Sequence, residues 1–414
     1  MAVRTLVRDL NPRLPREVQT LQAGALANSF GNGLILPFLF IYLHNVRAMS
    51  PAVSGLIVGT NSLVSLIAGP AFGPLVDRFG GRRTMTAALA FLAVGFGSYP
   101  LVHRPWQGFC AATLAGIGNG GFWPSQSTLI AGLTPPERRH QAFAMQRMMM
   151  NLGIGLGAVV AGQIASTEHP VTYTVLFLAD AGTFLAYMAV LQLVPQPERA
   201  SHEARAAAGG FAAVLRHRVF VAVVALNAVF ITAGLSQIDV LPGYLKNDAG
   251  HSERTISIVF LANTITIVLA QLPVARLQEG RRRMATLASV GAVWGGSWAL
   301  VPAVGGLGGT AVGAALFCLL GAVFGIGECL HGSVQAPLVS DLADPRLLGR
   351  YMAASAFSWS VGFAAGPALG GFGLGVDPAA LWEVSAAVCV ATGGAALALD
   401  RLLPASARWT PGSR

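Results

Sequence analysis

Residues 311–338 read AVGAALFCLLGAVFGIGECLHGSVQAPL, an apolar run with one acid in its middle, Glu328. A run of this length predicts a membrane-spanning helix, because about 20 apolar residues cross the hydrocarbon core of a bilayer. His331 and Gln335 follow Glu328 at helical spacing. An ionised carboxylate at this depth costs about 2.5–3.5 kcal/mol, so such a residue usually faces a cavity and handles protons or substrate. The stretch therefore makes transport the first hypothesis.

The composition of the whole chain favours a membrane protein. Of its 414 residues, 54% are hydrophobic and 11% are charged, and the mean hydropathy is +0.60. A soluble domain carries about 25% charged residues, so most of this chain must face lipid or other helices. The 50 glycines suit close packing of membrane helices. The four cysteines lie inside apolar stretches without metal-ligand spacing, so neither a disulfide framework nor a metal site is expected.

Twelve stretches of mostly apolar residues are long enough to span a membrane. Their approximate cores are 21–43, 53–76, 83–102, 107–133, 141–166, 171–194, 219–245, 255–277, 284–304, 310–340, 350–374 and 378–402. Arginine gathers on alternate connections and at both ends, and few basic residues fall on the opposite connections. The exceptions are Arg47, Arg104, Lys246 and Arg254. The positive-inside rule then predicts cytoplasmic termini and an even number of spans. It also explains the net charge of +9 without a nucleic-acid partner.

The two halves of the chain repeat each other. A shift of 209 residues superposes Gly118 on Gly327, Gln126 on Gln335, Pro136 on Pro345, Gly153 on Gly362 and Gly157 on Gly366. In this register Glu328 falls on Asn119, so the acid is peculiar to the second half. Duplicated bundles with a substrate site between them are a recurring transporter plan. We therefore predict two pseudo-symmetric six-helix bundles, 1–194 and 217–414, joined by a cytoplasmic linker at 195–216.

A charged segment connects the second and third predicted spans. Residues 73–83 read GPLVDRFGGRR and resemble the G-x-L-x-D-R-x-G-R-R loop of the major facilitator superfamily. The matching residues are Gly73, Asp77, Arg78, Gly80, Arg82 and Arg83. The resemblance implies a conformational latch, in which Asp77 contacts the start of the eleventh span near residues 347–351. A carboxylate suits that place, because a helix N-terminus offers unpaired N–H groups and the positive end of its dipole.

Two glycine-rich stretches extend the resemblance. Residues 153–162, GIGLGAVVAG, resemble the G-x-x-x-G-P-x-x-G-G motif of antiporters in this superfamily, with Ala158 in place of proline. The intact pattern, GFAAGPALGG, stands at 362–371 in the eleventh span. Such glycines form a groove for tight helix contact. With the twelve spans and the repeat, these motifs imply an all-α integral membrane protein that resembles the twelve-helix drug:proton antiporter, or multidrug efflux, branch.

The polar residues within the spans are the candidate site residues. The candidates for proton coupling are Glu328, Asp180, Asp239 and His331. Burial disfavours the charged form of a carboxyl group, which suits a group that loads and releases a proton near neutrality. Asp180 has an alternative role as a buried hydrogen-bond acceptor, and His331 has one as a partner of Glu328. The candidates for substrate binding are Asn28, Asn32, Trp123, Gln126, Arg147, Asn151, Gln237, Gln335 and Trp359. Arg147 either pairs with an intramembrane acid or reaches the lipid headgroups.

These features predict a secondary active transporter that exports amphipathic organic compounds or drugs against protons by alternating access. One alternative is a substrate-specific transporter for metabolite uptake or facilitated diffusion, and another is a transport-inactive membrane receptor. No phosphate-binding Walker loop, nucleophile–base pair or metal-ligand spacing stands out, so we expect no enzyme activity, cofactor or metal. We expect a monomer in the cell (inner or plasma) membrane, with a small molecule, protons and lipid as its partners.

Overall fold

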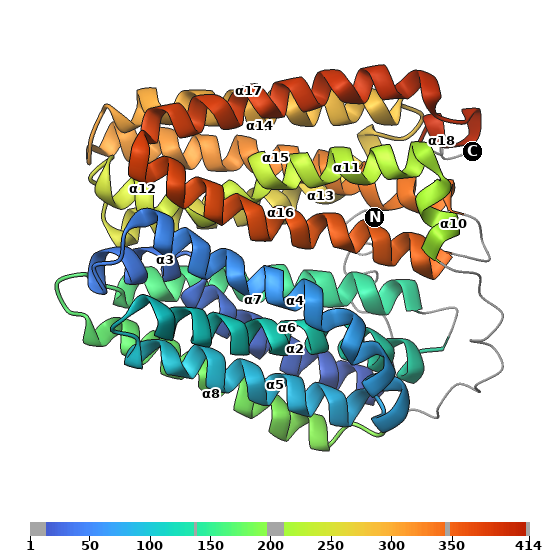
Figure 1. The fold of residues 1–414 in the computed structure, drawn as a ribbon, viewed down its shortest axis with the longest axis horizontal. Coiled ribbons are helices and arrows are strands. Elements are labelled where there is room, and N and C mark those ends of the chain that lie inside the picture. The colour runs from blue at the N-terminus through green and yellow to red at the C-terminus, as the bar shows by residue number, and fades with distance from the viewer. Residues whose placement is uncertain (1–13, 136–138, 197–210, 344–347, 411–414) are drawn as a thin grey trace, which may run out of the picture. The chain divides into compact units, whose positions relative to one another are not determined.

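The computed structural model describes residues 14–135, 139–196, 211–343 and 348–410. Within them the secondary structure is helical, apart from an isolated β-bridge between Arg282 and Trp409 (Figure 1). The long helices of the first half are α2 (Arg16–Ile35), α4 (Pro51–Phe79), α5 (Gly81–Ser98), α6 (Pro105–Leu133), α7 (Arg139–Ile164) and α8 (Val171–Gln192). Those of the second half are α11 (Arg218–Ala233), α13 (Glu253–Leu277), α14 (Arg283–Gly305), α15 (Ala311–Leu342), α16 (Leu348–Val376) and α17 (Pro378–Leu399). Each predicted span overlaps one of these helices.

Two predicted spans are broken. The first is α2 followed, beyond Pro37, by α3 (Leu39–Ile41) and the π-helix η1 (Tyr42–Val46). Pro37 has no N–H to donate and disfavours helical backbone at the residue before it, so the regular helix ends there. The seventh span is α11 followed, beyond Gly234, by the 3₁₀ helix η4 (Leu235–Asp239) and by α12 (Leu241–Asn247). Gly234 leaves the helical region at φ −99° and ψ −90°.

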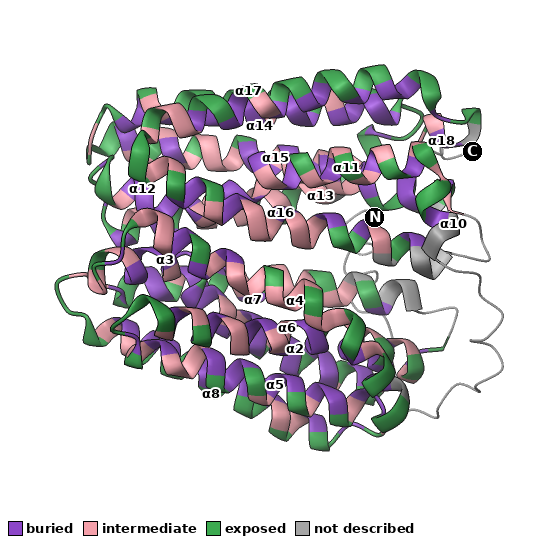
Figure 2. Ribbon diagram, in the orientation of Figure 1, coloured by how far each residue is buried: buried purple, intermediate pink, exposed green. Residues whose placement is uncertain are grey.

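The helices suit a lipid environment. Eight of them in the described residues are long and apolar enough to cross a membrane, or nine if the bent first span is included. Large apolar side chains are exposed on the helix surfaces, for example Ile67 at 69% and Leu269 at 70%. Figure 2 shows exposed positions recurring along the helices. So many exposed large apolar side chains suit contact with lipid better than contact with water.

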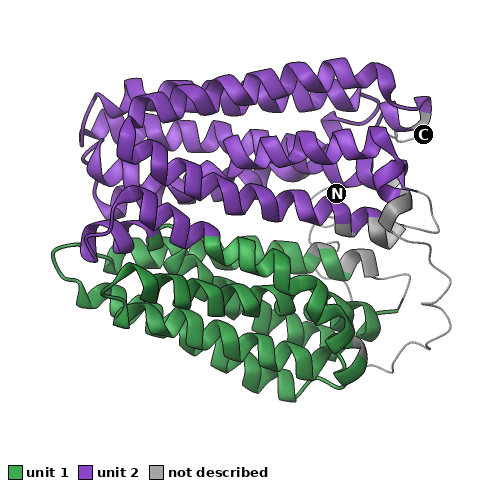
Figure 3. Cartoon of the chain, in the orientation of Figure 1, with its two compact units in different colours: residues 1–39, 60–200 green, residues 40–59, 201–414 purple. Residues whose placement is uncertain are grey.

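The chain divides into two compact units (Figure 3). Unit 1 comprises Met1–Leu39 and Thr60–Ala200, and unit 2 comprises Phe40–Gly59 and Ser201–Arg414. This division follows spatial contacts and groups residues 40–59 with the second half, whereas the predicted boundaries follow chain order. The domain limits 1–194 and 217–414 therefore remain a prediction. Within the predicted linker, residues 197–210 lie outside the described residues, and the short helix α10 (Phe211–Arg216) follows them.

Equivalent glycines pack the first and fifth spans of each half together. In unit 1 a Cβ atom added to Gly157 of α7 would lie 2.9 Å from the Cα of Gly33 in α2. In unit 2 a Cβ on Gly366 of α16 would lie 3.1 Å from the carbonyl oxygen of Thr232 in α11. Both backbones approach this closely only because the side chain is a hydrogen. Gly157 and Gly366 occupy the same place in the 209-residue repeat.

The segment 73–83 is tied to its own unit. Gly80 has φ +86°, a conformation that favours glycine, whereas a Cβ on Gly73 would meet no described atom within 4 Å. Arg82 Nη1 donates to the carbonyl oxygen of Val194 at 3.1 Å, just beyond α8, and the guanidinium of Arg78 lies over the Phe79 ring. The side chain of Asp77 and residues 344–347 lie outside the described residues, so the latch remains a prediction.

Candidate functional site

A polar pocket lies within unit 1, and four predicted substrate-binding residues line it. Its volume is about 140 Å³, well above the roughly 10–15 Å³ that a single water needs. The lining residues come from the α2 segment, α5, α6 and α7: Ala25, Asn28, Ser29, Asn32, Leu36, Leu92, Asn119, Phe122, Trp123, Gln126, Gln146, Met150 and Ile154. The structure thus brings Asn28, Asn32, Trp123 and Gln126 together. Gln146 and Met150 join them, although the sequence drew no attention to either residue.

A chain of hydrogen bonds orients the amides at one side of this pocket. The hydroxyl of Tyr187 donates to the carbonyl oxygen of Leu21 at 3.0 Å, so the Tyr187 oxygen accepts from Nε2 of Gln126 at 3.1 Å. The carbonyl oxygen of Gln126 therefore points the other way and accepts from Nε2 of Gln146. Because the chain ends on a backbone carbonyl, the direction of every bond in it is determined. Gln126 is thereby held in place from both ends.

Arg147 and Asn151 lie next to the pocket in sequence but do not line it. Arg147 is exposed, Asn151 is half-buried, and Arg147 forms no ion pair with an acid that the structure describes. Both substrate-binding assignments remain predictions.

In unit 2, Glu328 is held by an amide. Nδ2 of Asn263 in α13 donates to Oε1 of Glu328 in α15 at 2.8 Å and to the carbonyl oxygen of Gly321 at 3.2 Å. Glu328 is half-buried, whereas Asn263 is 8% exposed. A bond from a neutral donor to a carboxylate contributes about 1.5–3 kcal/mol. Glu328 therefore sits in a defined position, with part of its side chain accessible.

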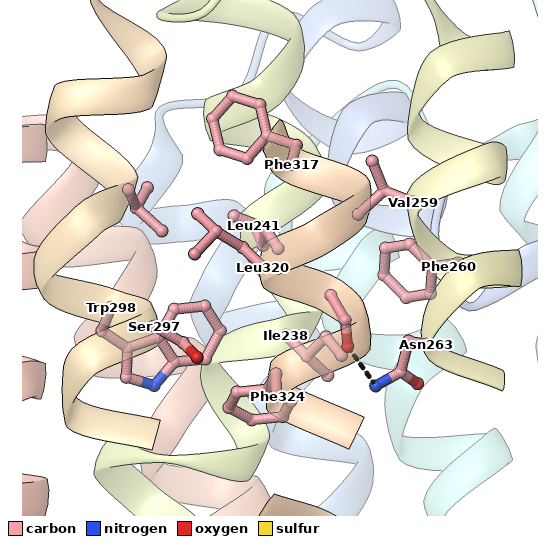
Figure 4. Close-up of a pocket in the computed structure, with 12 residues that line it drawn as sticks. Ile238, Leu241, Val259, Phe260, Asn263, Ser297, Trp298, Phe317, Leu320 and Phe324 are labelled. Atoms are coloured by element: carbon pink, nitrogen blue, oxygen red, sulfur yellow. Dashed lines mark hydrogen bonds between the residues drawn. The ribbon is translucent and has the colours of Figure 1, made fainter. Parts of the chain in front are cut away.

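Asn263 also lines a second, apolar pocket (Figure 4). Asn263 and Phe260 lie on one side of it and Trp298 lies on the other, with Phe317 and Phe324 at its ends. Its volume is about 20 Å³, close to the minimum for one water. This pocket is too small for an organic substrate in the conformation described, and Glu328 does not line it.

His331 takes part in a network across three helices. Nε2 of His331 lies 2.8 Å from Oδ1 of Asn227 in α11. Nδ2 of Asn227 donates to Oγ of Ser358 in α16 at 2.7 Å, and that hydroxyl donates to the carbonyl oxygen of Ser355 at 2.6 Å. The backbone carbonyl again determines the direction, so His331 carries a hydrogen on Nε2 and donates it. The ring of Trp359, a predicted substrate-binding residue, packs edge-on against His331 at 5.6 Å.

The other predicted residues lie in more closed surroundings. Asp180 is fully buried, neither oxygen has a hydrogen-bond partner in the described residues, and it lines neither pocket. Its Oδ1 faces Gly31 of α2, where an added Cβ would lie 2.5 Å away. Asp239 is half-buried at the end of η4. Gln237 donates to backbone carbonyls of α11 and α16, and the Nε2 of buried Gln335 has no described partner. Their roles remain predictions.

The sequence did not indicate a buried ion pair at the start of α14. Arg283 is fully buried, and its Nη2 pairs with Asp341 at the end of α15. Nη1 of Arg283 reaches the carbonyl oxygen of Ala407 at 3.4 Å, and neighbouring Arg282 pairs with Asp400 at 2.8 Å. In the sequence both arginines belong to a basic connection between two spans, which indicates only topology. Their contacts with Ala407 and Asp400 also connect the segment after α17 to the start of α14.

Corresponding helix pairs in the two units make corresponding contacts. In unit 1, Nδ2 of Asn119 in α6 donates to Oδ1 of Asn61 in α4 at 2.9 Å, and a Cβ on Gly116 would lie 2.6 Å from the Asn61 carbonyl oxygen. In unit 2, Glu328 and Asn263 form the equivalent pair, and a Cβ on Gly325 would lie 3.1 Å from the Asn263 carbonyl oxygen. Asn119 and Glu328, like Gly116 and Gly325, follow the 209-residue register, whereas their partners Asn61 and Asn263 are 202 residues apart. A neutral amide pair in one unit is a carboxylate–amide pair in the other.

A family model described as Major Facilitator Superfamily matches residues 22–241 and 238–413. The chain belongs to the major facilitator superfamily. The predicted resemblance and the all-α membrane fold are thereby confirmed, and this superfamily member is an integral membrane protein. Its relatives and structural neighbours are transporters. They support a transporter rather than an enzyme and do not specify the substrate.

Two relatives illustrate the similarity in sequence. The MFS-type transporter YqjV of Bacillus subtilis (strain 168) is 24% identical over 85% of each chain. The multidrug resistance protein MdtH of Klebsiella pneumoniae (strain 342) is 25% identical over 82% of each chain.

Solved structures with 14% identity share the fold of this superfamily member. A POT family transporter in complex with 5-aminolevulinic acid has a TM-score of 0.77 over 93% of this chain and 96% of its own. The nucleoside transporter NupG has a TM-score of 0.70 over 93% of this chain and 99% of its own.

Proposed function

We propose that this protein is a proton-coupled exporter of amphipathic organic compounds or drugs that works by alternating access. The observation that carries the proposal is the pair of titratable side chains on α15, Glu328 and His331, each held by an amide from another helix. Relatives named as multidrug resistance proteins support export. We place the protein in the cell membrane as a monomer, with both termini in the cytoplasm.

The proposed coupling depends on charge. An ionised Glu328 accepts the hydrogen bond from Asn263, and protonation removes the charge and turns one oxygen into a donor. The partners preferred by α15 therefore differ between the two protonation states. A ligand or proton shifts a conformational equilibrium only through such a difference in interaction. We propose that proton loading at Glu328 favours one orientation of the bundles and that substrate favours the other, with Asp77 and the arginines of 73–83 as the latch.

A substrate-specific metabolite transporter is the second candidate. The amides that line the polar pocket favour it, because precisely oriented polar groups give specificity. The structural neighbours include transporters of narrower substrate classes, such as the nucleoside transporter NupG. A transport-inactive receptor would have the same fold but would not carry out the transport cycle of alternating access.

Proteoliposomes with an imposed pH gradient separate these candidates. A growth-inhibition panel, comparing cells with and without the protein, first supplies compounds to test. Each compound is then added to liposomes that contain a pH-sensitive dye. Proton movement that depends on both protein and compound supports exchange. Solute flux without proton movement supports facilitated diffusion, and no flux of any compound supports the receptor.

A further inference from the structure

Two short segments of unit 2 carry a concentration of positive charge at the ends of three spans. They are residues 276–283, which connect α13 to α14, and residues 400–410, which follow α17. Together they contain six arginines and only two acids, Glu279 and Asp400. We call these two segments the basic surface. Its excess of positive charge favours a negatively charged partner.

The segment after α17 folds back onto the connection between α13 and α14. The N–H group of Gly280 donates to the carbonyl oxygen of Thr410 at 3.1 Å, and the N–H group of Thr410 donates to the carbonyl oxygen of Arg281 at 3.0 Å. The isolated β-bridge between Arg282 and Trp409 belongs to the same pairing. The basic surface is therefore held in a defined arrangement by backbone hydrogen bonds and is not a loose tail.

Much of the positive charge is not balanced within the protein. The ion pairs of Arg282 and Arg283 described above involve two of the six arginines. Arg276, Arg281 and Arg401 are exposed, and none of them pairs with an acid in the part of the chain that the structure describes. A guanidinium group presents several N–H donors in a planar arrangement that suits phosphate oxygens. These three arginines are thus available to an anion from outside the protein.

The basic surface lies where the membrane spans end. The apolar span of α14 begins at Arg283, and that of α17 ends at Leu402. Leu402 is 65% exposed, Leu277 is 62% exposed and Trp409 is 51% exposed, and the guanidinium of Arg282 lies 5.5 Å from the centre of the Trp409 ring. Exposed apolar and indole groups beside arginines are typical of the boundary between acyl chains and headgroups. A soluble anion would leave the apolar groups in water, whereas a phospholipid contacts both kinds of side chain.

We infer that the basic surface binds the headgroup of an anionic phospholipid, with the lipid phosphate on Arg281 and Arg401 and the apolar part of the lipid against Leu402 and Trp409. Basic surfaces at the ends of membrane helices recognise such headgroups through their charge. A zwitterionic lipid has the same phosphate but also carries a cation, which the arginines disfavour. The inference goes beyond the proposed function, because it depends on neither the transported compound nor the proton.

Native mass spectrometry of the delipidated full-length protein tests the inference, because it counts individual bound lipids. Phosphatidylglycerol and phosphatidylcholine with identical acyl chains are added in separate titrations. We expect phosphatidylglycerol to bind at least about tenfold more tightly, since its headgroup has a net negative charge. Equal binding of the two lipids would overturn the inference. Displacement of phosphatidylglycerol by an equal concentration of glycerol phosphate would assign the arginines to a soluble phosphate and would overturn it as well.

A double variant locates the lipid on the protein. Arg281→Gln combined with Arg401→Gln removes two exposed charges and no described ion pair. Each arginine near an anionic lipid contributes about fivefold in affinity, so the double variant should bind phosphatidylglycerol about 25-fold more weakly. Its weak binding of phosphatidylcholine should not change. Arg401→Gln alone, with an expected loss of about fivefold, is the second variant if the double variant does not fold.

The matched control removes the same charge from another place in unit 2. Arg216→Gln combined with Arg218→Gln replaces two exposed arginines, and α10, which ends at Arg216, lies at the same end of unit 2 as α18 (Ala405–Arg408) (Figure 1). This variant should bind phosphatidylglycerol like the wild type. Equal losses in the two double variants would show a general attraction to a positive face and would contradict a site on the basic surface.

Discussion

Replacement of Glu328 by glutamine tests the proposed coupling with little change in shape. The amide oxygen of glutamine can occupy the position of Oε1 and accept the hydrogen bond from Asn263, which measures 2.8 Å in the wild type. The bond changes from charge-assisted, worth about 1.5–3 kcal/mol, to neutral, worth about 0.5–1.5 kcal/mol. The loss of about 1 kcal/mol is offset because a half-buried carboxylate no longer has to be desolvated. We therefore expect a folded protein with near wild-type thermal stability.

The effect on transport is far larger than the effect on stability. One proton that crosses a gradient of one pH unit supplies about 1.4 kcal/mol, which supports about a tenfold concentration ratio of a substrate exchanged for one proton. Without a group to carry the proton, Glu328→Gln should hold no concentration ratio above one. Exchange of labelled for unlabelled substrate needs no net proton movement, so it should persist in the variant.

The assay uses proteoliposomes with the pH gradient imposed in one arm and absent in the other. Loss of gradient-driven accumulation with retention of exchange supports the proposed role of Glu328. Glu383→Gln, the same exchange at an exposed acid of α17, controls for reconstitution. Full accumulation by Glu328→Gln would refute the reasoning, because the proton would then have to travel through another group. Loss of exchange as well would show that Glu328 serves substrate binding or folding instead.

Three further predictions concern the scaffold. Asp341→Asn should lower the free energy of unfolding by about 2–3 kcal/mol, because it leaves the buried Arg283 without its ion-pair partner; the cost stays below that of a fully buried pair because the Asp341 side chain is 41% exposed. Unfolding followed with a thiol-reactive dye should show this loss, and the double variant Arg283→Met, Asp341→Leu should restore most of the stability. Burial lowers the pKa of His251 from its ordinary 6.5, so the unfolded chain binds more protons in mild acid and stability should fall as the pH drops from about 8 to about 5. The melting temperature of His251→Phe should depend less on pH than that of the wild type, and an unchanged dependence would contradict the assignment. Gly157→Ala should cost about 1–3 kcal/mol by forcing α7 away from α2, whereas Gly182→Ala, with no described atom within 4 Å of its added Cβ, should cost nothing in the same melting assay, and equal effects would argue against the tight crossing.

The helices could be predicted from the sequence because lipid imposes one strong demand. Every backbone polar group in the bilayer must be paired within the segment, so a long apolar run has almost no choice but helix. This requirement does not predict where a helix is interrupted. The break after Ile35 and the one at Gly234 depend on local backbone preferences and on neighbouring helices, and hydropathy registers neither.

The site could be predicted only in part. Depth within a span identifies polar residues such as Asn28 and Asp180, but it does not tell which of them share a cavity. Asn28 lines the polar pocket, whereas Asp180 on α8 is enclosed. Gln146 was overlooked because a single glutamine near a helix end looks ordinary, and its importance comes from its bond to Gln126. In the sequence Arg283 is one of several arginines that indicate topology, and its pairing is hidden because its partner Asp341 is distant along the chain.

The repeat gives the acid of the second half a physical context. If Glu328 were only a filler at a helix crossing, its counterpart Asn119 shows that an amide suffices there, because Asn119 bonds to Asn61 in the same arrangement. An amide cannot gain or lose a proton near neutral pH, whereas a carboxylate can. The second half thus carries, at a contact that the first half makes without charge, a group that costs more to place in a membrane. Because the packing does not require this costly carboxylate, its presence is best explained by its ability to gain and lose a proton, which an amide lacks.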